Sequence, residues 1–243
     1  MDVLTATAAS GLRSRMESLE LLANNVANAA TGGYKADREF YSLYVGPGQD
    51  SDPSSTMPLV ERHWTDLSQG VLQSTGNQLD VALSGSGFFT VAGPNGPLYT
   101  RNGNFRLAPD GRLVTGDGYA VMGVGTTSLT LQPSRPLDIS NDGNVQQDGN
   151  AIGQLAIADF PSNRVLVKQG SNYFRLTDPA LQPTTPASTS ILQGKLEASN
   201  TGVAEAAVRL VNVMRQFEML QKAVSLGVEM NRRAVEEVAK VGA

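Results

Sequence analysis

The sequence predicts a mixed fold in which an antiparallel β domain, barrel or sandwich-like, is inserted between long N- and C-terminal α-helices that pair as a coiled coil. Three observations predict it. A heptad repeat of apolar residues occupies the C-terminal end, a shorter one occupies the N-terminal end, and short alternating apolar runs separated by turn residues fill the middle.

The C-terminal helix is predicted over residues 203–241. Its heptad positions are Val203, Leu210, Phe217, Val224, Asn231 and Val238, with Ala206, Val213, Leu220, Gly227, Ala234 and Val241 between them. Asn200 and Thr201 supply N-cap oxygens, and Lys240 followed by Gly242 suits the other end. At about 1.5 Å per residue the helix is roughly 60 Å long, so its apolar stripe needs another helix, from this chain or a neighbouring one.

The N-terminal helix offers a candidate partner. Leu12, Leu19 and Val26 recur at seven, after a cap at Asp2 or Thr5. Both stripes contain small residues, so we expect helices that are marginal alone and become ordered when several copies pack together. A helical hairpin within one chain, docked on a domain, fits the same periodicity.

Three asparagines, Asn24, Asn25 and Asn28, precede the glycine pair Gly32-Gly33, which ends the helix. If the helix persists through the asparagines, their amides are best satisfied by another chain. Otherwise the segment is a polar helix end that frays into a turn. The aromatic segment that follows, Arg38–Tyr44, has no clear secondary-structure signal.

Two polar, proline-containing stretches divide the chain. They predict linkers at 46–58 and 177–190, which bracket a β domain at 59–176. The flanking segments are the N-terminal helix with its signature, 1–45, and the C-terminal coiled-coil helix, 191–243. Removing the bracketed part would leave the two helices facing each other, as expected for an inserted domain.

The bracketed segment is predicted to be β throughout. Short apolar-alternating runs such as Phe88–Val91 and Leu98–Arg101 are separated by turn signals such as Asn95-Gly96 and Asp110-Gly111. Many short strands at this spacing are typical of an antiparallel barrel or sandwich.

Composition excludes several classes of function. The 243 residues carry a net charge of -4 without a lysine- or arginine-rich stripe, which argues against nucleic-acid binding. The absence of cysteine excludes disulfides and thiolate chemistry. Apolar runs are too short for a membrane-spanning helix, and the N-terminus does not have the pattern of a secretory signal. If the protein leaves the cytoplasm, we expect a route without a cleaved signal peptide.

No catalytic, cofactor or metal site is predicted. The single histidine, His63, has no nearby acid or nucleophile in the sequence. Gly85-Ser86-Gly87 lacks the third glycine of a dinucleotide fingerprint and leads into a strand. Asp138–Gly143 resembles half of a calcium loop, but Gly149 stands where the bidentate glutamate is required. We therefore predict that the protein is not an enzyme.

Three ordered motifs cover the chain from end to end. The first motif, near the N-terminus, is Ala23–Asn28 with Thr31, Gly33, Tyr34 and Lys35. The second, in the middle of the chain, comprises Leu79–Leu83, Gly87–Val91, Tyr99–Phe105, Asp110–Val114 and Gly118. The third, near the C-terminus, is Gly194–Asn200 with Arg215, Phe217, Glu218 and Met219. Together they resemble the bacterial flagellar basal-body rod and hook proteins. The sequence departs from that pattern at Gly32 and at Thr201-Gly202, which affects local capping only. The short central segment excludes a hook-sized subunit and favours the proximal over the distal rod protein.

The resemblance implies a structural, self-assembling motility protein. In this family the terminal helices pack as a coiled coil in the inner wall of a tube and the β domain lies outside. The implied subunit polymerises with itself and with other rod subunits through its terminal helices, giving a drive shaft that crosses the periplasm and transmits torque. The implied delivery route is the flagellar type III export apparatus, with the chain unfolded. Nucleic acid, small-molecule substrates and a membrane span are not expected.

The heptads and motifs together predict a subunit interface. Its residues are Leu12, Leu19, Asn24, Asn25, Val26, Asn28, Thr31, Gly33, Tyr34, Asn200, Val203, Leu210, Val213, Phe217, Leu220, Val224, Asn231 and Val238. An alternative from another class is a binding module for a surface or glycan ligand, oligomerised by its helices. That alternative requires an aromatic-lined face, and Trp64, Tyr99 and Tyr119 are dispersed in the sequence.

Overall fold

The computed structural model describes residues 3–44, 57–125, 127–133, 135–162, 165–170, 172–178, 180–186 and 188–241. The chain divides into two compact units. The helical unit consists of Met1–Ala27, Asp37–Thr65 and Gly202–Ala243, and the β unit consists of Asn28–Ala36 and Asp66–Thr201. Because each unit is assembled from separate stretches, the chain passes between the units four times.

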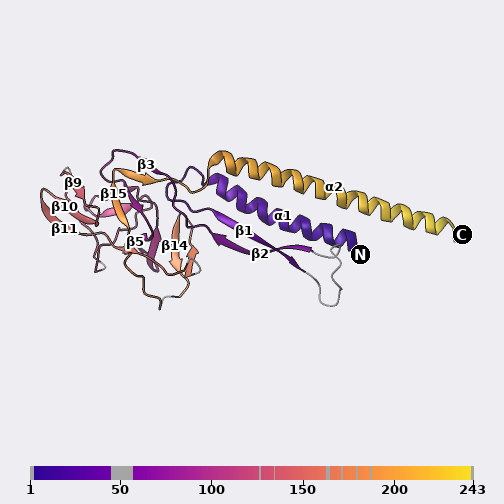
Figure 1. The fold of residues 1–243 in the computed structure, drawn as a ribbon, viewed down its shortest axis with the longest axis horizontal. Helices are drawn as coiled ribbons and strands as arrows, with labels where there is room; N and C mark the ends of the chain where they lie inside the picture. The colour runs from indigo at the N-terminus through magenta and orange to yellow at the C-terminus, as the bar shows by residue number, and fades with distance from the viewer. Residues whose placement is uncertain are drawn as a thin grey trace. The chain divides into compact units, whose positions relative to one another are not determined.

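The helical unit contains two helices and one hairpin. Helix α1 spans Val3–Ala27, helix α2 spans Val203–Val241, and strands β1 (Asp37–Tyr44) and β2 (Met57–Thr65) pair antiparallel. The two helices lie side by side and the hairpin runs along α1 (Figure 1). The segment Arg38–Tyr44, which had no clear signal in the sequence, is therefore strand. The predicted linker 46–58 lies outside the described residues except for Met57 and Pro58, which begin β2.

The prediction of long terminal helices that pair as a coiled coil is wrong. Helix α1 has 25 residues against 39 in α2, so the N-terminal helix is short. The buried line of α1 is Gly11, Ser14, Ser18, Leu22 and Asn25, whereas the predicted seam residues Leu12, Leu19 and Val26 are only partly buried. The reason is that both α2 and the hairpin pack on α1, so its buried line falls between the predicted positions and consists mostly of small or polar residues.

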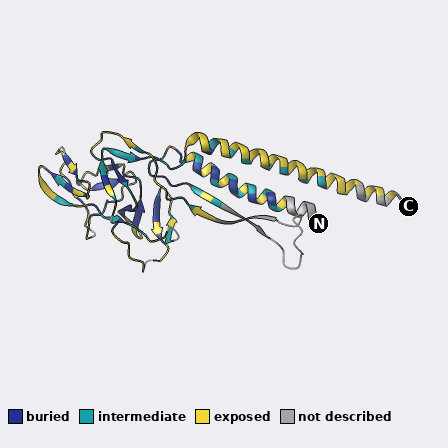
Figure 2. Ribbon diagram, viewed as in Figure 1, coloured by how far each residue is buried: buried dark blue, intermediate teal, exposed yellow. Residues whose placement is uncertain are grey.

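Helix α2 is exposed along most of its length (Figure 2). Among the α2 side chains that the structure describes, Ala206 alone is buried. The partly buried heptad positions are Leu210, Val213, Phe217, Leu220, Val224 and Gly227, while Val203 and Asn231 are exposed and the side chain of Val238 lies outside the described set. Leu220 lies against Gly11 of α1, where a glycine stands in place of the side chain that a coiled-coil partner would present.

The β unit is built from small antiparallel sheets in place of the predicted single barrel or sandwich. The five-stranded sheet has the order β12 (Ile157–Ala158), β5 (Phe88–Gly93), β6 (Gly96–Thr100), β14 (Tyr173–Leu176) and β13 (Leu166–Lys168). The three-stranded sheet has the order β11 (Asn150–Gln154), β10 (Asn144–Gln147) and β9 (Leu137–Ile139). Frequent turns keep these strands short, so in the described residues they form local sheets.

Three further pairs complete the unit. Strand β4 (Val81–Ser84) pairs with β15 (Ser190–Gln193), β3 (Leu72–Ser74) pairs with β16 (Lys195–Glu197), and β7 (Phe105–Leu107) pairs with β8 (Leu113–Thr115). The first two of these pairs join the beginning of the Asp66–Thr201 stretch to its end. The β unit therefore closes by bringing its last strands back to its first.

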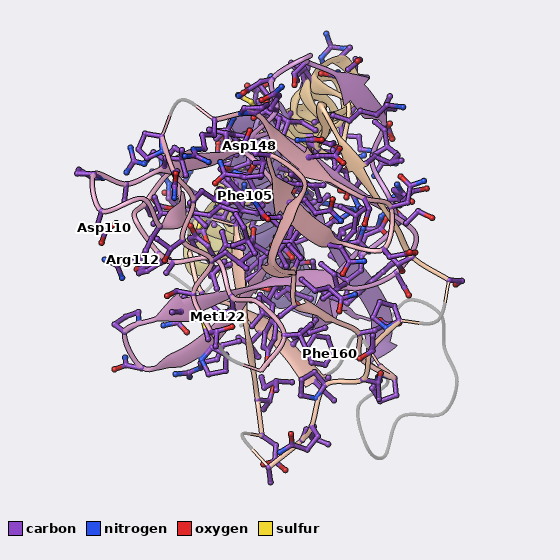
Figure 3. The ribbon with its side chains drawn as sticks, turned by 90° about the vertical axis from the view of Figure 1, so that its left-hand side faces the viewer. Phe105, Asp110, Arg112, Met122, Asp148 and Phe160 are labelled. Atoms are coloured by element: carbon purple, nitrogen blue, oxygen red, sulfur yellow. The ribbon has the colours of Figure 1, made fainter. Side chains whose placement is uncertain are left out.

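Two apolar clusters fill the β unit. The larger contains Val81, Phe89, Val91, Phe105 and twelve other buried side chains, Tyr173 among them, and the smaller is centred on Phe88, Tyr99 and Phe174. Phe160 packs edge-on against Tyr99 in the smaller cluster. Asp110 and Arg112 form an exposed ion pair in the turn between β7 and β8, away from Phe160 (Figure 3). In the described part of the chain, neither helix is both long and apolar enough to cross a membrane.

Candidate functional site

A buried charged cluster of Lys35, Arg101 and Glu197 lies inside the β unit. The ammonium Nζ of Lys35 is 2.5 Å from Oε1 of Glu197, and Nη1 of Arg101 is 3.2 Å from Oε2 of the same carboxylate. The side chains of Lys35 and Glu197 have no exposed area and that of Arg101 is 4% exposed. These residues come from the segment after α1, from the loop after β6 and from β16, so the cluster joins three distant parts of the sequence.

The cluster also fixes backbone. Lys35 donates to the carbonyl of Ser68 at 2.6 Å, and the carboxylate of Glu197 accepts from the amide of Gly70 at 2.8 Å. The carbonyl of Glu197 accepts from the amide of Gly33 at 2.7 Å. Arg101 donates through Nη2 to the carbonyl of Gly85 at 2.8 Å. Each charged side chain is thus bound both to another charge and to main chain, which is what a buried charge requires.

Asn200 makes a second set of links beside the cluster. Its Oδ1 accepts from the amide of Ala36 at 2.8 Å, and its Nδ2 donates to the carbonyl of Asp66 at 2.7 Å. The amide of Asp66 in turn donates to the carbonyl of Ala36 at 2.9 Å. Ala36, Asp66 and Asn200 each lie within two residues of a point where the chain passes between the two units. One side chain therefore ties together three of the four crossing points.

The segment before Lys35 requires glycine. Gly33 has φ of 68°, and a Cβ at that position would lie 2.4 Å from the backbone nitrogen of Asn102. Tyr34, the next residue, is buried, and Nζ of Lys168 lies 4.4 Å from its ring centroid, within reach of a cation–π interaction. The turn at Gly33 lets the chain pass close to Asn102 and points it toward Glu197.

Burial sets the electrostatics of the cluster. Desolvation lowers the pKa of Lys35, and the Glu197 carboxylate opposes that effect. Desolvation likewise lowers the pKa of Arg101, against the attraction of Glu197 and Asp159. The guanidinium of Arg101 lies over the ring of Phe88, 5.2 Å from its centroid, and its Nε has no hydrogen-bond partner in the described structure. Two cations thus share one directly bonded carboxylate.

The geometry is that of a structural clamp. The three charged side chains have almost no exposed area. His63 is exposed on β2. Within the described ranges, no group of three or more His, Cys, Asp or Glu side chains could hold a metal ion. The aromatic residues of the alternative binding module do not form an open face, because Tyr99 is buried and Tyr119 packs edge-on against Tyr173.

The structure places the predicted interface residues in three groups. Asn28, Thr31, Gly33, Tyr34 and Asn200 belong to the β unit, where Thr31 donates to Oδ1 of Asn28 at 3.4 Å. In α1, Leu12, Leu19 and Val26 are partly buried, Asn24 is exposed and Asn25 is buried. The α2 residues form the third group. Whether any of these residues contacts another subunit stays a prediction.

Sequence reasoning missed the charged cluster. Lys35, Arg101 and Glu197 each belong to one of the three motifs, but none was assigned a role. The available signal was the setting of each residue: Lys35 follows a glycine–tyrosine turn, and Glu197 stands in the short strand Lys195–Glu197. Charged residues within such ordered motifs are candidates for buried pairs, although the pairing itself cannot be inferred from one sequence.

Comparison with known proteins identifies the family. Residues 82–147 match the model of the flagellar hook protein FlgE/F/G D1 domain, and residues 192–237 match that of the flagellar basal body rod FlgEFG protein C-terminal region. The chain is 34% identical over 231 residues to the flagellar basal-body rod protein FlgF of Caulobacter vibrioides, covering 92% of both chains. It is 32% identical to FlgG of Buchnera aphidicola subsp. Schizaphis graminum, covering 90% of this chain and 94% of that protein.

A third relative is FlgG of Agrobacterium fabrum, 30% identical over 249 residues, with 93% of this chain and 95% of the relative covered. Arg101 lies in the first matched region, and Glu197 and Asn200 lie in the second. The cluster therefore joins the two regions that the family models recognise to the segment after α1. On this similarity over nearly its whole length, the chain belongs to the flagellar basal-body rod protein family.

Proposed function

We propose that this structural subunit of the flagellar basal-body rod assembles with its neighbours, copies of itself included, through the exposed side of α2. The observation that carries the proposal is the number of apolar side chains left in water on that helix. Eight of the fourteen exposed large hydrophobic residues in the described structure belong to α2. They are Val203, Val208, Val211, Met214, Met219, Leu226, Val228 and Met230.

These side chains are 46% to 71% exposed. Burying apolar surface contributes about 25 cal/mol per Å², so several such residues together favour association. Isolated exposed apolar residues are common on monomers, but a helix that carries eight of them marks an interaction surface. Because the surface extends along a helix, the occupant that fits it is a helix of a neighbouring rod subunit.

The described side chains in the C-terminal part of α2, from Val228 onward, are all exposed. Helix α2 is longer than α1 by 14 residues (39 minus 25), which is about 21 Å at 1.5 Å per residue. In Figure 1 the last turns of α2 continue past the start of α1. Leu226, Val228 and Met230 approach this end. A contact between one patch and a different patch on the next subunit gives an open filament when its rotation does not close into a ring.

The location and delivery of the subunit complete the proposal. A rod subunit of this kind would lie in the periplasmic part of the basal body and transmit torque there. Export through the flagellar type III apparatus suits a cysteine-free chain whose helical unit leaves much of α2 unburied. The short central segment favours a place in the proximal rod. That finer assignment requires localisation within isolated basal bodies.

The test uses full-length Leu226→Asp in cells that lack the wild-type subunit. We expect loss of rod incorporation, measured in isolated basal bodies, and loss of swimming, while the helix content of the purified subunit is unchanged. Ser225→Asp is the matched control, because it adds the same charge at the neighbouring exposed position without removing an apolar side chain. Swimming cells with normal amounts of the Leu226→Asp protein in their rods would contradict the proposal.

A further inference from the structure

We infer that residues 28–36 form a latch on the β unit, a segment that opens locally while the apolar core of the unit stays folded. The latch belongs to the β unit, although residues 37–65 of the helical unit separate it from the rest of that unit in the sequence. It is joined to α1 on one side and to β1 on the other. Its release would therefore detach the chain between α1 and β1 from the β unit.

The contacts that hold the latch are mainly polar. Besides the bonds of Gly33, Lys35 and Ala36 to Glu197 and Asn200, the carbonyl of Gly32 accepts from Nδ2 of Asn172 at 3.1 Å. The partners of these bonds in the β unit are Asn172, Asn200 and Glu197. Hydrogen bonds of this kind can be exchanged for bonds to water at modest net cost, which is the condition for local opening.

The core does not depend on the latch. The larger apolar cluster draws its buried residues from Val81 to Ile191, and the smaller draws its own from Phe88 to Leu176. Neither cluster contains a residue of the latch. Three residues of the latch itself, Ala29, Tyr34 and Ala36, are buried. The strand pairs β5–β6 and β4–β15, with the side chains between them, are nevertheless complete without the latch. Opening would therefore remove no side chain from either cluster.

Glu197 controls closure. Closing the latch takes the ammonium of Lys35 out of water and places it near Arg101, which is unfavourable unless the carboxylate of Glu197 is in position. Glu197 reaches that position only when β16 has paired with β3. Lys35 and Glu197 are 162 positions apart, so the closed latch requires the beginning and the end of the β unit to be together. The apolar clusters do not require the latch in return, because neither contains one of its residues.

The test is amide hydrogen exchange of the full-length chain. Exchange in the wild-type protein is measured at increasing urea concentrations. The opening that exposes the amides of Gly33, Ala36 and Gly70 should occur more often, and depend less on urea, than the opening that exposes β4 and β5. This measurement requires no variant. Exchange of latch and core amides through a single common opening would overturn the inference.

Variants give a second, independent readout. Lys35→Met should speed exchange of the Gly33 and Ala36 amides by at least about tenfold, and their opening should stay more frequent and less denaturant-dependent than the one that exposes Val81–Val91. Lys195→Met is the matched control, because Lys195 lies on β16, is only partly buried, and should leave both sets unchanged. The inference fails if the latch and core amides of Lys35→Met exchange through one common opening, or if the variant changes none of these amides.

Discussion

Lys35 hydrogen-bonds one carboxylate, that of Glu197, whereas Glu197 receives bonds from both Lys35 and Arg101 in the described structure. Removing Lys35 leaves the Glu197 carboxylate with Arg101 and with the amide of Gly70. After the same removal, the carbonyl of Ser68 still accepts from Nδ2 of Asn200, which lies farther away than Lys35, at 3.3 Å. Removing the charge of Glu197 leaves two buried cations without a directly bonded anion. The removal of Lys35 and the removal of the Glu197 charge therefore have unequal consequences.

The asymmetry predicts that Glu197→Gln destabilises the β unit more than Lys35→Met does. We expect losses of about 3–5 kcal/mol for the first and about 1–3 kcal/mol for the second, because an uncompensated buried charge costs more than a lost bond whose acceptor keeps another donor. Urea unfolding of the purified full-length chain, followed by the near-ultraviolet signal of its tyrosines, measures both values. Equal losses would show that the cluster acts as a simple pair.

The buried ammonium also predicts a pH dependence. Burial lowers the pKa of Lys35 below 10.5, so between its folded-state pKa and 10.5 the unfolded chain binds more protons at this residue than the folded chain. The Lys35 contribution to stability should therefore rise with pH across that interval. The measurement is the difference in free energy of unfolding between wild type and Lys35→Met, which cancels the other titrating groups. If the wild type instead loses stability relative to Lys35→Met as pH rises, the lowered pKa of Lys35 is contradicted.

A matched pair of glycines separates backbone strain from steric exclusion. Gly33 and Gly76 have nearly the same φ, 68° and 72°, but a Cβ at Gly76 would meet nothing within 4 Å, whereas one at Gly33 would lie 2.4 Å from the nitrogen of Asn102. We expect Gly76→Ala to cost about 1–2 kcal/mol from the left-handed conformation alone. Gly33→Ala should cost at least about 3 kcal/mol because backbone must also move. Similar melting temperatures for the two variants would refute the close approach.

Helix α2 shows what sequence periodicity can and cannot predict. The repeat from Val203 to Val241 predicted the extent of the helix, and the family motifs predicted the family, because both signals are local in the sequence. The same periodicity could not show that α1 has neighbours on two sides. As a result, Leu12, Leu19 and Val26 were predicted to lie on a seam, while the buried line runs through Ser14 and Ser18.

Strand β1 and the charged cluster were missed for a related reason. The segment Arg38–Tyr44 becomes a strand by pairing with β2, and pairing partners are not encoded in the segment itself. Lys35 and Glu197 are separated by 162 positions, so no spacing rule connects them. Interactions that depend on chain closure require the fold, whereas the extent of α2 did not.

Asn25 provides a test of whether the asparagines after the first heptads act within the chain. Its Nδ2 donates to the carbonyl of Asp37 at 2.8 Å and its Oδ1 accepts from the amide of Asp37 at 3.0 Å, so a buried amide joins α1 to the start of β1. We expect Asn25→Ala to destabilise the helical unit by about 2–3 kcal/mol, since two buried bonds are lost and the backbone groups of Asp37 are left without them.

Asn24 is the matched control for that substitution, because it is the adjacent residue of the same type and is exposed. Asn24→Ala should change the free energy of unfolding by less than about 0.5 kcal/mol. Thermal unfolding of the two purified variants gives the stability, and recovery of each in isolated rods gives the assembly. If Asn25→Ala left stability unchanged but prevented incorporation, its amide would serve a neighbouring subunit and the bond to Asp37 would be incidental. If Asn25→Ala loses stability and Asn24→Ala does not, the role of Asn25 lies within the subunit. There its amide fixes β1 on α1 before any neighbour arrives.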